Sequence, residues 1–315
     1  MTAHAWPPGR TRAARTRPGG RPPRRSRVAW WYTAPTLLVV ALVTIFPIGF
    51  SVVMSFSRVE LSSSGFSFTD WSTDNYAAVL QSPVWREALV FTVLYTLVSV
   101  AVELVLGVLV ALVLERLTAA RGWLMALLLI PWAMITVISA QLWSYIFNSA
   151  YGAASWLLGL FTDEPPVILG TPASAFSAIL VADVWKTTPF VAIIVLAGLV
   201  TIDRSVYEAA EMDGSGPWST FWRITLPLLR TTLAIAVLFR VLQAFGIFDL
   251  PFVLTSGGPG TSTQPLALLG WRVMFQNLNM GAGAAVAAST ALIVFLACLL
   301  CLRAFRAQVG EEEVR

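Results

Sequence analysis

Long apolar runs, separated by short polar segments, dominate the pattern of residues along this chain. A helix needs ~20 predominantly apolar residues to cross the hydrocarbon core of a bilayer. The pattern therefore predicts six spanning helices, at roughly residues 30–56, 87–114, 123–147, 173–200, 228–252 and 282–305. Because the segments between them are too short for an added soluble domain, we expect an all-α membrane protein with one six-helix domain at residues 30–306.

The composition supports this interpretation. Apolar residues make up 57% of the chain, charged residues only 12%, and the mean hydropathy is +0.74. Such values are typical of a polytopic membrane protein and exclude a soluble globular domain.

The distribution of Lys and Arg predicts the orientation, because loops on the cytoplasmic side carry the positive excess. Residues 1–29 contain eight Arg and no acid, whereas the acids predominate in the loops 57–86 and 148–172. We therefore expect residues 1–29 to be a disordered cytoplasmic tail that sets the topology, and residues 307–315 to be a cytoplasmic tail as well. The loop 201–227 then faces the cytoplasm. No stacking aromatics are interleaved with the arginines, so no nucleic-acid binding is predicted.

The polar segment between the fourth and fifth runs, residues 203–227, has the spacing of a docking element. Asp203 can cap a short helix that continues through Ala210, and Gly214 and Gly216 can adopt the positive backbone dihedrals of a reversal. Pro217 can begin a second short helix. The aromatic residues expected on that helix, before Pro227 interrupts it, are Trp218, Phe221 and Trp222.

Several ionisable residues fall inside the predicted spans, and five of them bear on function. A charge near the centre of a bilayer costs ~3 kcal/mol or more on insertion scales, so such residues usually face a cavity or a partner. We interpret Glu103 as an anchor for helix packing. The others are Asp183 and Lys186 in the fourth span, and Arg240 and Asp249 in the fifth.

Three mixed helix faces surround these charges. The fourth span places Asp183, Thr187 and Phe190 on one face by their spacing, the fifth places Arg240, Gln243 and Ile247 together, and the third adds Trp132 and Thr136 directly after Pro131. Planar polar groups beside aromatic rings are typical of surfaces that bind sugars. The alternative is that Asp183, Lys186 and Arg240 form a buried ion network that only fixes helix packing.

Other chemistry is not indicated. Cys298 and Cys301 lie in an apolar run with no His or carboxylate nearby, so we expect neither a metal site nor redox activity there. The chain has no G-x-x-x-x-G-K-[ST] sequence, so it cannot itself hold ATP in a P-loop. We therefore expect no cofactor on this chain.

The segment 203–227 resembles the EAA motif of bacterial ABC importer permeases, through Glu208-Ala209-Ala210, Asp213-Gly214 and Ile224-Thr225-Leu226-Pro227. The resemblance implies a type I importer permease fold and a loop that docks onto a cytoplasmic ATPase. The residues that it assigns to coupling are Glu208, Ala209, Ala210, Asp213, Gly214, Trp218, Phe221 and Pro227.

Further segments are similar to the carbohydrate branch of that family, which includes the maltose and trehalose systems. These segments are Phe46-Pro47-Ile48, Leu129-Ile130-Pro131-Trp132, Val184 through Phe190, Phe239-Arg240, and Thr255-Ser256-Gly257-Gly258-Pro259. The resemblance implies a site for a sugar, and the expected sugar is a disaccharide such as trehalose or maltose. The residues that it assigns to this site are Trp132, Thr136, Asp183, Thr187, Phe190, Arg240, Gln243 and Ile247, to which we add Lys186. Arg240, Gln243 and Ile247 depart from the pattern of maltose permeases.

The partners implied by the resemblance are a second permease subunit, most simply in a heterodimer, a dimeric cytoplasmic ATPase that carries ATP and Mg²⁺, and an extracytoplasmic solute-binding protein. The chain would lie among membrane lipids in the bacterial inner membrane. Import would proceed by alternating access around a central site.

Two rival functions remain open on the sequence. Lys186 and Arg240 could clamp a phosphate, as a glycerol-3-phosphate importer permease would need. The acids of residues 201–213 could instead serve a membrane-embedded sugar or lipid transferase.

Overall fold

The computed structural model describes residues 25–62, 65–117, 119–162 and 167–310. The elements in order are α1 (Arg25–Ser55), β1 (Arg58–Ser62), β2 (Gly65–Thr69), α2 (Asp74–Gln81), α3 (Pro83–Arg116), α4 (Arg121–Ala133), α5 (Thr136–Ile146), α6 (Ala153–Gly159), α7 (Pro172–Val200), α8 (Arg204–Met212), α9 (Pro217–Thr220), the π-helix η1 (Phe221–Thr225), α10 (Leu226–Phe245), α11 (Asp249–Leu254), α12 (Leu266–Trp271), the π-helix η2 (Arg272–Gln276) and α13 (Met280–Gly310).

The chain divides into two compact units, residues 1–50 and 51–315. The described part of the first unit is the helix α1 up to Phe50, which contains Pro35 and Pro47. Its apolar side chains are almost all exposed, among them Trp31 and Leu38. A predominantly apolar helix with so little packing of its own is typical of a segment that faces lipid.

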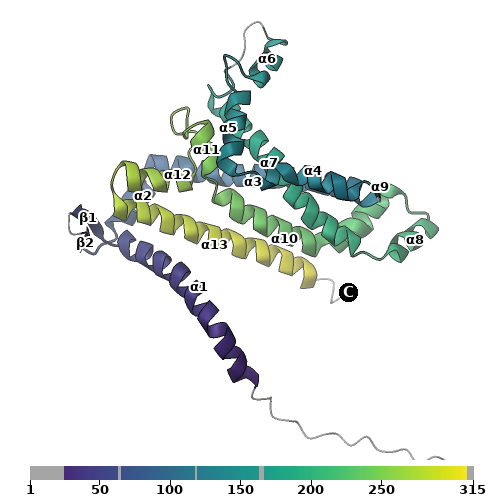
Figure 1. Cartoon of the computed structure of the whole chain (residues 1–315), viewed down its shortest axis with the longest axis horizontal. Coiled ribbons are helices and arrows are strands. Elements are labelled where there is room, and N and C mark those ends of the chain that lie inside the picture. Colours follow the sequence, from purple (N-terminus) through teal and green to yellow (C-terminus); the bar gives the residue numbers. More distant parts are fainter. Residues whose placement is uncertain (1–24, 63–64, 118, 163–166, 311–315) are drawn as a thin grey trace, which may run out of the picture. The chain divides into compact units, whose positions relative to one another are not determined.

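The second unit is a helical bundle whose interior is formed by α3, α7 and α10 (Figure 1). Two clusters of buried apolar side chains lie along these helices, one around Tyr95 and Ile179 and the other around Val191 and Leu229. Gly107 on α3 allows the close approach of α7, because a Cβ atom there would lie 2.6 Å from Val191 Cγ1.

Five helices are long and apolar enough to cross a membrane within the described residues, and the bent pair α4 and α5 makes a sixth span if it counts as one. The prediction of a continuous third helix at 123–147 was wrong in this respect. The chain turns by 89° between Ala133 and Thr136. Pro131 contributes to this break, because it has no N–H for the helix ladder and α4 closes with the Met134 N–H on the Pro131 carbonyl.

The fifth span also differs from its predicted range of 228–252. A continuous helical segment runs from Pro217 to Phe245 through α9, η1 and α10, and Gly246 follows its end. Asp249 then begins the separate short helix α11. Pro227 does not interrupt the segment: the π-helix η1 directly precedes it, with the Leu226 N–H on the Phe221 carbonyl, and the helix continues past the proline as α10.

A small hairpin is an addition to the all-α prediction. Strands β1 and β2 pair antiparallel with Val59 opposite Phe68 and Ser62 opposite Gly65. Gly65 has φ +111°, a dihedral that favours glycine at the turn.

The first and last helices extend further towards the chain ends than we expected. Helix α1 begins at Arg25, and α13 continues to Gly310. The predicted disorder of the first tail concerns mainly residues 1–24, which lie outside the described residues, as do 311–315.

Candidate functional site

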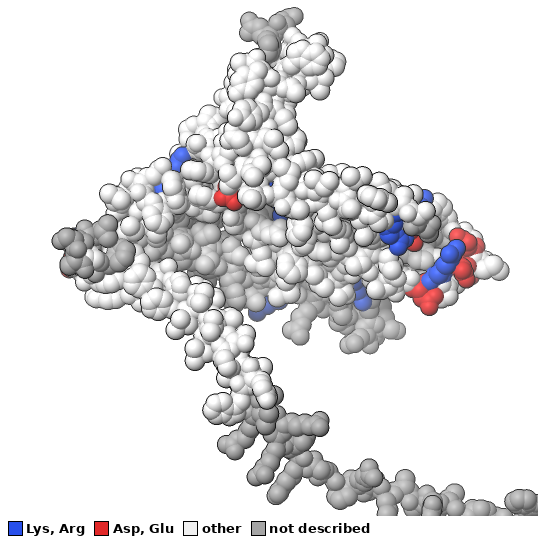
Figure 2. Space-filling model, viewed as in Figure 1, with Lys and Arg blue, Asp and Glu red and all other residues white. Residues whose placement is uncertain are grey.

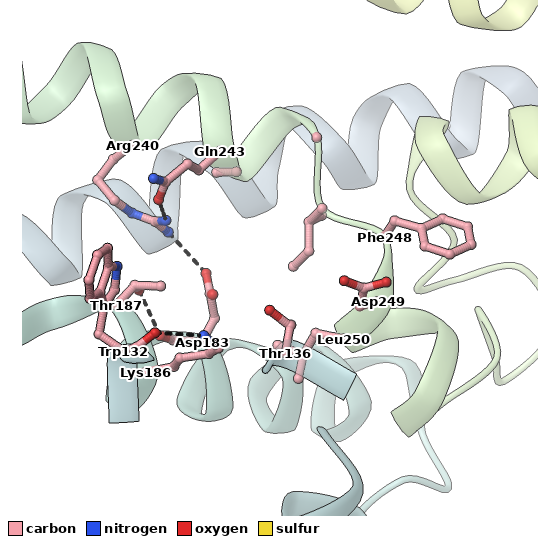
Figure 3. A pocket seen from close by; sticks show the side chains of 13 residues that line it. Trp132, Thr136, Asp183, Lys186, Thr187, Arg240, Gln243, Phe248, Asp249 and Leu250 are labelled. Atoms are coloured by element: carbon pink, nitrogen blue, oxygen red, sulfur yellow. Dashed lines mark hydrogen bonds and ion pairs between the residues drawn. The ribbon is translucent and has the colours of Figure 1, made fainter. Parts of the chain in front are cut away.

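A cavity of about 280 Å³ lies where the break between α4 and α5 meets α7, α10 and the turn before α11 (Figure 3). This volume is close to the lower end of the range for small-ligand pockets, ~300–1,000 Å³. Its lining residues are Trp132, Thr136, Asp183, Lys186, Thr187, Arg240, Gln243, Ala244, Gly246, Ile247, Phe248, Asp249 and Leu250. The three mixed faces predicted from the sequence therefore do converge on one cavity.

Arg240 is the centre of the polar network behind this cavity, and its side chain is buried. Its guanidinium forms a bidentate pair with Glu103, through Nε to Oε2 and through Nη2 to Oε1 at 2.8 Å. Nη2 also donates to Asp183 Oδ2 at 3.0 Å, and Nη1 donates to Gln243 Oε1 at 2.9 Å. Figure 3 shows Arg240 and Asp183 facing one another between α10 and α7.

Tyr95 completes this network, and the sequence analysis missed it. Its buried hydroxyl donates to Asp183 Oδ2 at 2.5 Å, so one carboxylate oxygen accepts from both Tyr95 and Arg240. Within the part of the chain that the structure describes, the other oxygen, Oδ1, accepts no hydrogen bond. The signal was present in the sequence, because Tyr95 lies about two helical turns before Glu103 on the same face of one span.

Lys186 makes contacts that the sequence did not predict. Its Nζ donates to the carbonyl oxygens of Met134 at 2.9 Å and Trp132 at 3.3 Å. These carbonyls belong to the break between α4 and α5, where the helix ladder cannot satisfy them. Lys186 lines the cavity, and its ammonium group bridges the backbone at the break between α4 and α5. No ion pair joins it to Asp183 or to any other acid among the described residues.

Aromatic rings cover one side of the site. Trp132 stacks on Phe190, with ring centroids 5.3 Å apart and planes at 8°, and Phe239 meets Phe190 edge-on at 6.3 Å. Phe190 is thus a support for Trp132 and does not itself line the cavity. Trp132 remains 41% exposed, so part of its ring is free to cover a solute.

Both interpretations of the intramembrane charges describe part of the structure. Asp183 and Arg240 do form a buried ion pair, as the packing interpretation required, and Glu103 anchors a helix contact as expected. Both Asp183 and Arg240 nevertheless line the cavity. Lining residues that we did not assign include Phe248, Asp249 and Leu250, which the sequence placed on a continuous fifth helix.

The predicted docking segment forms a helix, a turn and a second helix. Asp203 caps α8, and its Oδ1 accepts from the Ser205 N–H at 2.9 Å, which lowers the pKa of the Asp203 carboxyl. Gly214 has φ +74°, as expected for the reversal, whereas Gly216 has φ −73° and is not in the left-handed region. Ser215 donates to the Ala210 carbonyl and closes the turn.

Exposed aromatic and charged residues cover this segment. The ring centroids of Trp218 and Phe221 lie 6.5 Å apart, and Trp218 is largely exposed. Glu208 is exposed beside Arg204, with 3.6 Å between their charged atoms. Ala209 and Asp213 are exposed as well, whereas Ala210 is buried against the turn. Figure 2 shows Lys, Arg, Asp and Glu gathered over the end of the molecule that carries α8, while most of the described surface in that view is uncharged.

Comparisons with known proteins agree with this arrangement. Residues 26–308 match the family described as "Binding-protein-dependent transport system inner membrane component". The chain is 37% identical to the trehalose/maltose transport system permease protein MalF of Thermococcus litoralis, over 90% of this chain and 95% of the relative. It is 36% identical to the sulfoquinovosyl glycerol transport system permease protein SmoG of Agrobacterium fabrum, over 86% of each. A solved bacterial ABC transporter involved in the import of the acidic polysaccharide alginate contains a chain with the same fold, at TM-score 0.78, 19% identity, and 90% and 96% coverage.

The chain belongs to the family of inner membrane components of binding-protein-dependent transport systems. It has the type I ABC importer permease fold that we expected, and it is a multi-pass membrane protein. It is a transport subunit, and ATP hydrolysis is carried by a separate ATPase. The rival interpretation as a membrane-embedded transferase, an enzyme, does not hold for a member of this family.

Proposed function

We propose that this chain is the permease subunit of an ATP-driven importer that carries a sugar, and that the cavity at the α4–α5 break is where the sugar passes. The observation that carries the proposal is the pairing, in one cavity, of the Trp132 ring with Asp183 and Gln243. An aromatic face covers the apolar C–H surface of a pyranose, while a carboxylate and an amide accept from and donate to its hydroxyls.

A disaccharide such as trehalose or maltose is the solute that we favour. Support comes from the relative from Thermococcus litoralis, which is a trehalose/maltose transport system permease protein. The cavity volume of about 280 Å³ suits a small solute better than a long polymer. The departures that we noted at Arg240, Gln243 and Ile247 all line the cavity, so they are the positions where preference among sugars is decided.

A glycerol-3-phosphate importer has less support. A phosphate clamp requires cations with free N–H groups. Arg240 already donates to Glu103, Asp183 and Gln243, and Lys186 donates to two backbone carbonyls. Neither cation is therefore presented to an anion in the way that a clamp requires.

The assembly that we propose follows from symmetry. The segment 203–227 of one permease docks on one ATPase subunit, so a dimeric ATPase requires a second permease, either a related chain or a second copy. A solute-binding protein delivers the sugar on the other side of the inner membrane. The N- and C-termini and α8 then lie in the cytoplasm, as the distribution of Arg predicts.

In the proposed mechanism, the two docked segments approach one another when the ATPase dimer binds ATP and separate after hydrolysis. The bundle helices move with them, so that the cavity opens alternately to each side. Glu208 pairs with a cation of the ATPase, and Trp218 with Phe221 packs in an apolar cleft of it. The exposure of the Trp218 ring supports this role, because exposed apolar side chains that cluster commonly mark interfaces.

The test is ATPase activity of the complex reconstituted in proteoliposomes with its ATPase and binding protein. Trehalose, maltose and glycerol 3-phosphate are added separately. Stimulation by a disaccharide is expected. Stimulation by the phosphate alone would instead establish the rival importer, and no binding of any ATPase would refute the assembly.

The orientation has its own test. The chain contains only Cys298 and Cys301, so replacing both by Ser gives a background for single cysteines. A cysteine at Ser205 should be labelled by a membrane-impermeant maleimide only in inside-out vesicles, and one at Thr73 only in right-side-out vesicles. The opposite pattern would refute the proposed topology.

A further inference from the structure

Glu103 is buried completely on α3 and does not line the cavity, yet its carboxylate contacts Arg240 and Thr187, which do. Its carboxylate accepts from Arg240 Nε and Nη2, and the Thr187 hydroxyl lies 2.6 Å from its Oε1. It therefore stands one layer behind the site, in contact with α10 and α7 together.

The hydrogen bonds of Arg240 show what Glu103 does to it. A guanidinium has five N–H groups and no acceptor. Glu103 takes the Nε group and one Nη2 group, Asp183 takes the other Nη2 group, and Gln243 takes one Nη1 group. A single Nη1 N–H remains, so this cation has little capacity left for a solute.

The groups that keep capacity are its two neighbours. Asp183 uses Oδ2 for Arg240 and Tyr95, and among the described residues nothing donates to its Oδ1. Gln243 accepts from Arg240 through Oε1, which leaves the two N–H groups of its amide. The cavity thus presents a free acceptor and a free donor, the pair that a sugar hydroxyl can use because it donates and accepts at once.

We propose that Glu103 is a positioning residue that sets the specificity of the cavity: by engaging Arg240 from behind, it withdraws the cation from the solute and leaves Asp183 and Gln243 to bind hydroxyl groups. The proposal rests on the proposed function, since it assumes that the cavity binds a sugar. It predicts that Glu103 selects uncharged sugars over anionic ones.

The decisive variant is Glu103→Gln, which keeps the shape and removes one buried negative charge. Arg240 would then regain donor capacity and uncompensated charge close to the cavity, which favours an anion by Coulomb attraction. The matched control is Thr96→Val on the same helix. Thr96 is equally buried, and its hydroxyl bonds only to the Thr92 carbonyl of its own helix.

The experiment measures equilibrium binding of radiolabelled trehalose and trehalose 6-phosphate to the purified complex of permeases and ATPase in nanodiscs. Glu103→Gln should weaken trehalose binding roughly tenfold and shift the ratio of the two affinities roughly tenfold or more towards the phosphate, the scale of one charged hydrogen bond. Thr96→Val should leave the ratio unchanged. An assembled Glu103→Gln complex with the wild-type ratio would overturn the proposal.

The double variant Glu103→Met with Arg240→Met covers the case in which Glu103→Gln does not assemble, since replacing both members of a buried ion pair by apolar residues is often tolerated. With Arg240 itself absent, the ratio of the trehalose affinity to the trehalose 6-phosphate affinity should not shift towards the phosphate, and such a shift in this variant would overturn the proposal. Failure of both variants to assemble would assign the pair to bundle assembly and would also overturn it. The measurement on the wild-type complex tests the proposed function alone. If the wild-type complex bound only trehalose 6-phosphate, or neither trehalose nor trehalose 6-phosphate, the proposed function would be refuted and the inference with it.

Discussion

The charges inside the bundle and those on α8 are the same residue types in opposite settings. Arg240 and Glu103 are 2% and 0% exposed and are joined by two hydrogen bonds, with Asp183 as a further partner. Arg204 and Glu208 are 92% and 68% exposed, and their charged atoms lie 3.6 Å apart. The first group is surrounded by helices on all sides, whereas the second faces solvent.

This difference decides what each ion pair can do. A buried charge that loses its partner keeps the full free-energy cost of its removal from water. A substitution that breaks the buried pair therefore destabilises the fold strongly. A surface pair is screened by water and ions and contributes little to folding, so its charges are free to bind another protein. The charges inside the bundle therefore fix how the helices are arranged around the cavity, and the charges on α8 are suited to binding another protein.

The largest effect is expected for Arg240→Met. It leaves Glu103 and Asp183 buried without their cation, which should cost about 3–5 kcal/mol and abolish uptake. Arg204→Met is the control on the exposed pair and should change stability by less than about 0.5 kcal/mol. Thermal melting of the purified permease measures both. Equal melting temperatures for the two variants would contradict the comparison.

The second effect concerns packing. In Gly107→Ala, the new Cβ would lie 2.6 Å from Val191 Cγ1 and 3.2 Å from the Ala192 backbone nitrogen, so α3 and α7 would have to separate. We expect a loss of about 1–3 kcal/mol. Gly122→Ala is the matched control, because a Cβ at that helical position meets nothing within 4 Å. A melting temperature unchanged by Gly107→Ala would show that the two helices are not closely packed there.

A smaller change in stability is expected for Glu208→Lys, only a few tenths of a kcal/mol, because its pair with Arg204 is exposed. Uptake and sugar-stimulated ATP hydrolysis should fall sharply, since the charge that we assign to docking is reversed. Glu115→Lys, an exposed acid outside the segment 203–227, serves as the control. Normal uptake by the Glu208 variant would refute its role in docking.

The smallest effect is local, at the start of α8. Asp203→Ala removes the cap on the Ser205 N–H, so amide hydrogen exchange should accelerate in the first turn, whereas Asp203→Asn should retain protection. The pKa of Asp203 is lowered in the folded chain, so its stabilising contribution is present above about pH 4 and is lost as the pH falls through the folded pKa. Exchange that is independent of Asp203 would exclude the cap.

Much of this architecture follows from the sequence alone. Runs of apolar residues locate the spans, because few other structures tolerate them. Helical spacing also brought together Asp183 with Thr187, and Arg240 with Gln243, since neighbours on one helix face are fixed by its period. The capped helix of the docking segment was predictable for the same reason: Asp203 and Ser205 are local in the chain.

The remainder depends on contacts between distant residues. Nothing near Pro131 shows that Lys186 will satisfy the carbonyls freed at the α4–α5 break, because the two are more than fifty positions apart. The same holds for Tyr95 and Asp183. The error at Pro227 has a different origin. A proline commonly ends or kinks a helix, and only the π-helix before it shows that this helix continues past it.

The helical segment from Pro217 to Phe245 is continuous, so a rigid movement of one end displaces the other end as well. Trp218 and Arg240 lie on this one helical segment, roughly 33 Å apart along its axis at ~1.5 Å per residue. A tilt of about 5° at one end displaces the other by roughly 3 Å, which exceeds the few tenths of an ångström over which a hydrogen bond keeps its geometry. If the aromatic end docks as we propose, a small tilt of this segment would be enough to break the contact between Arg240 and Asp183.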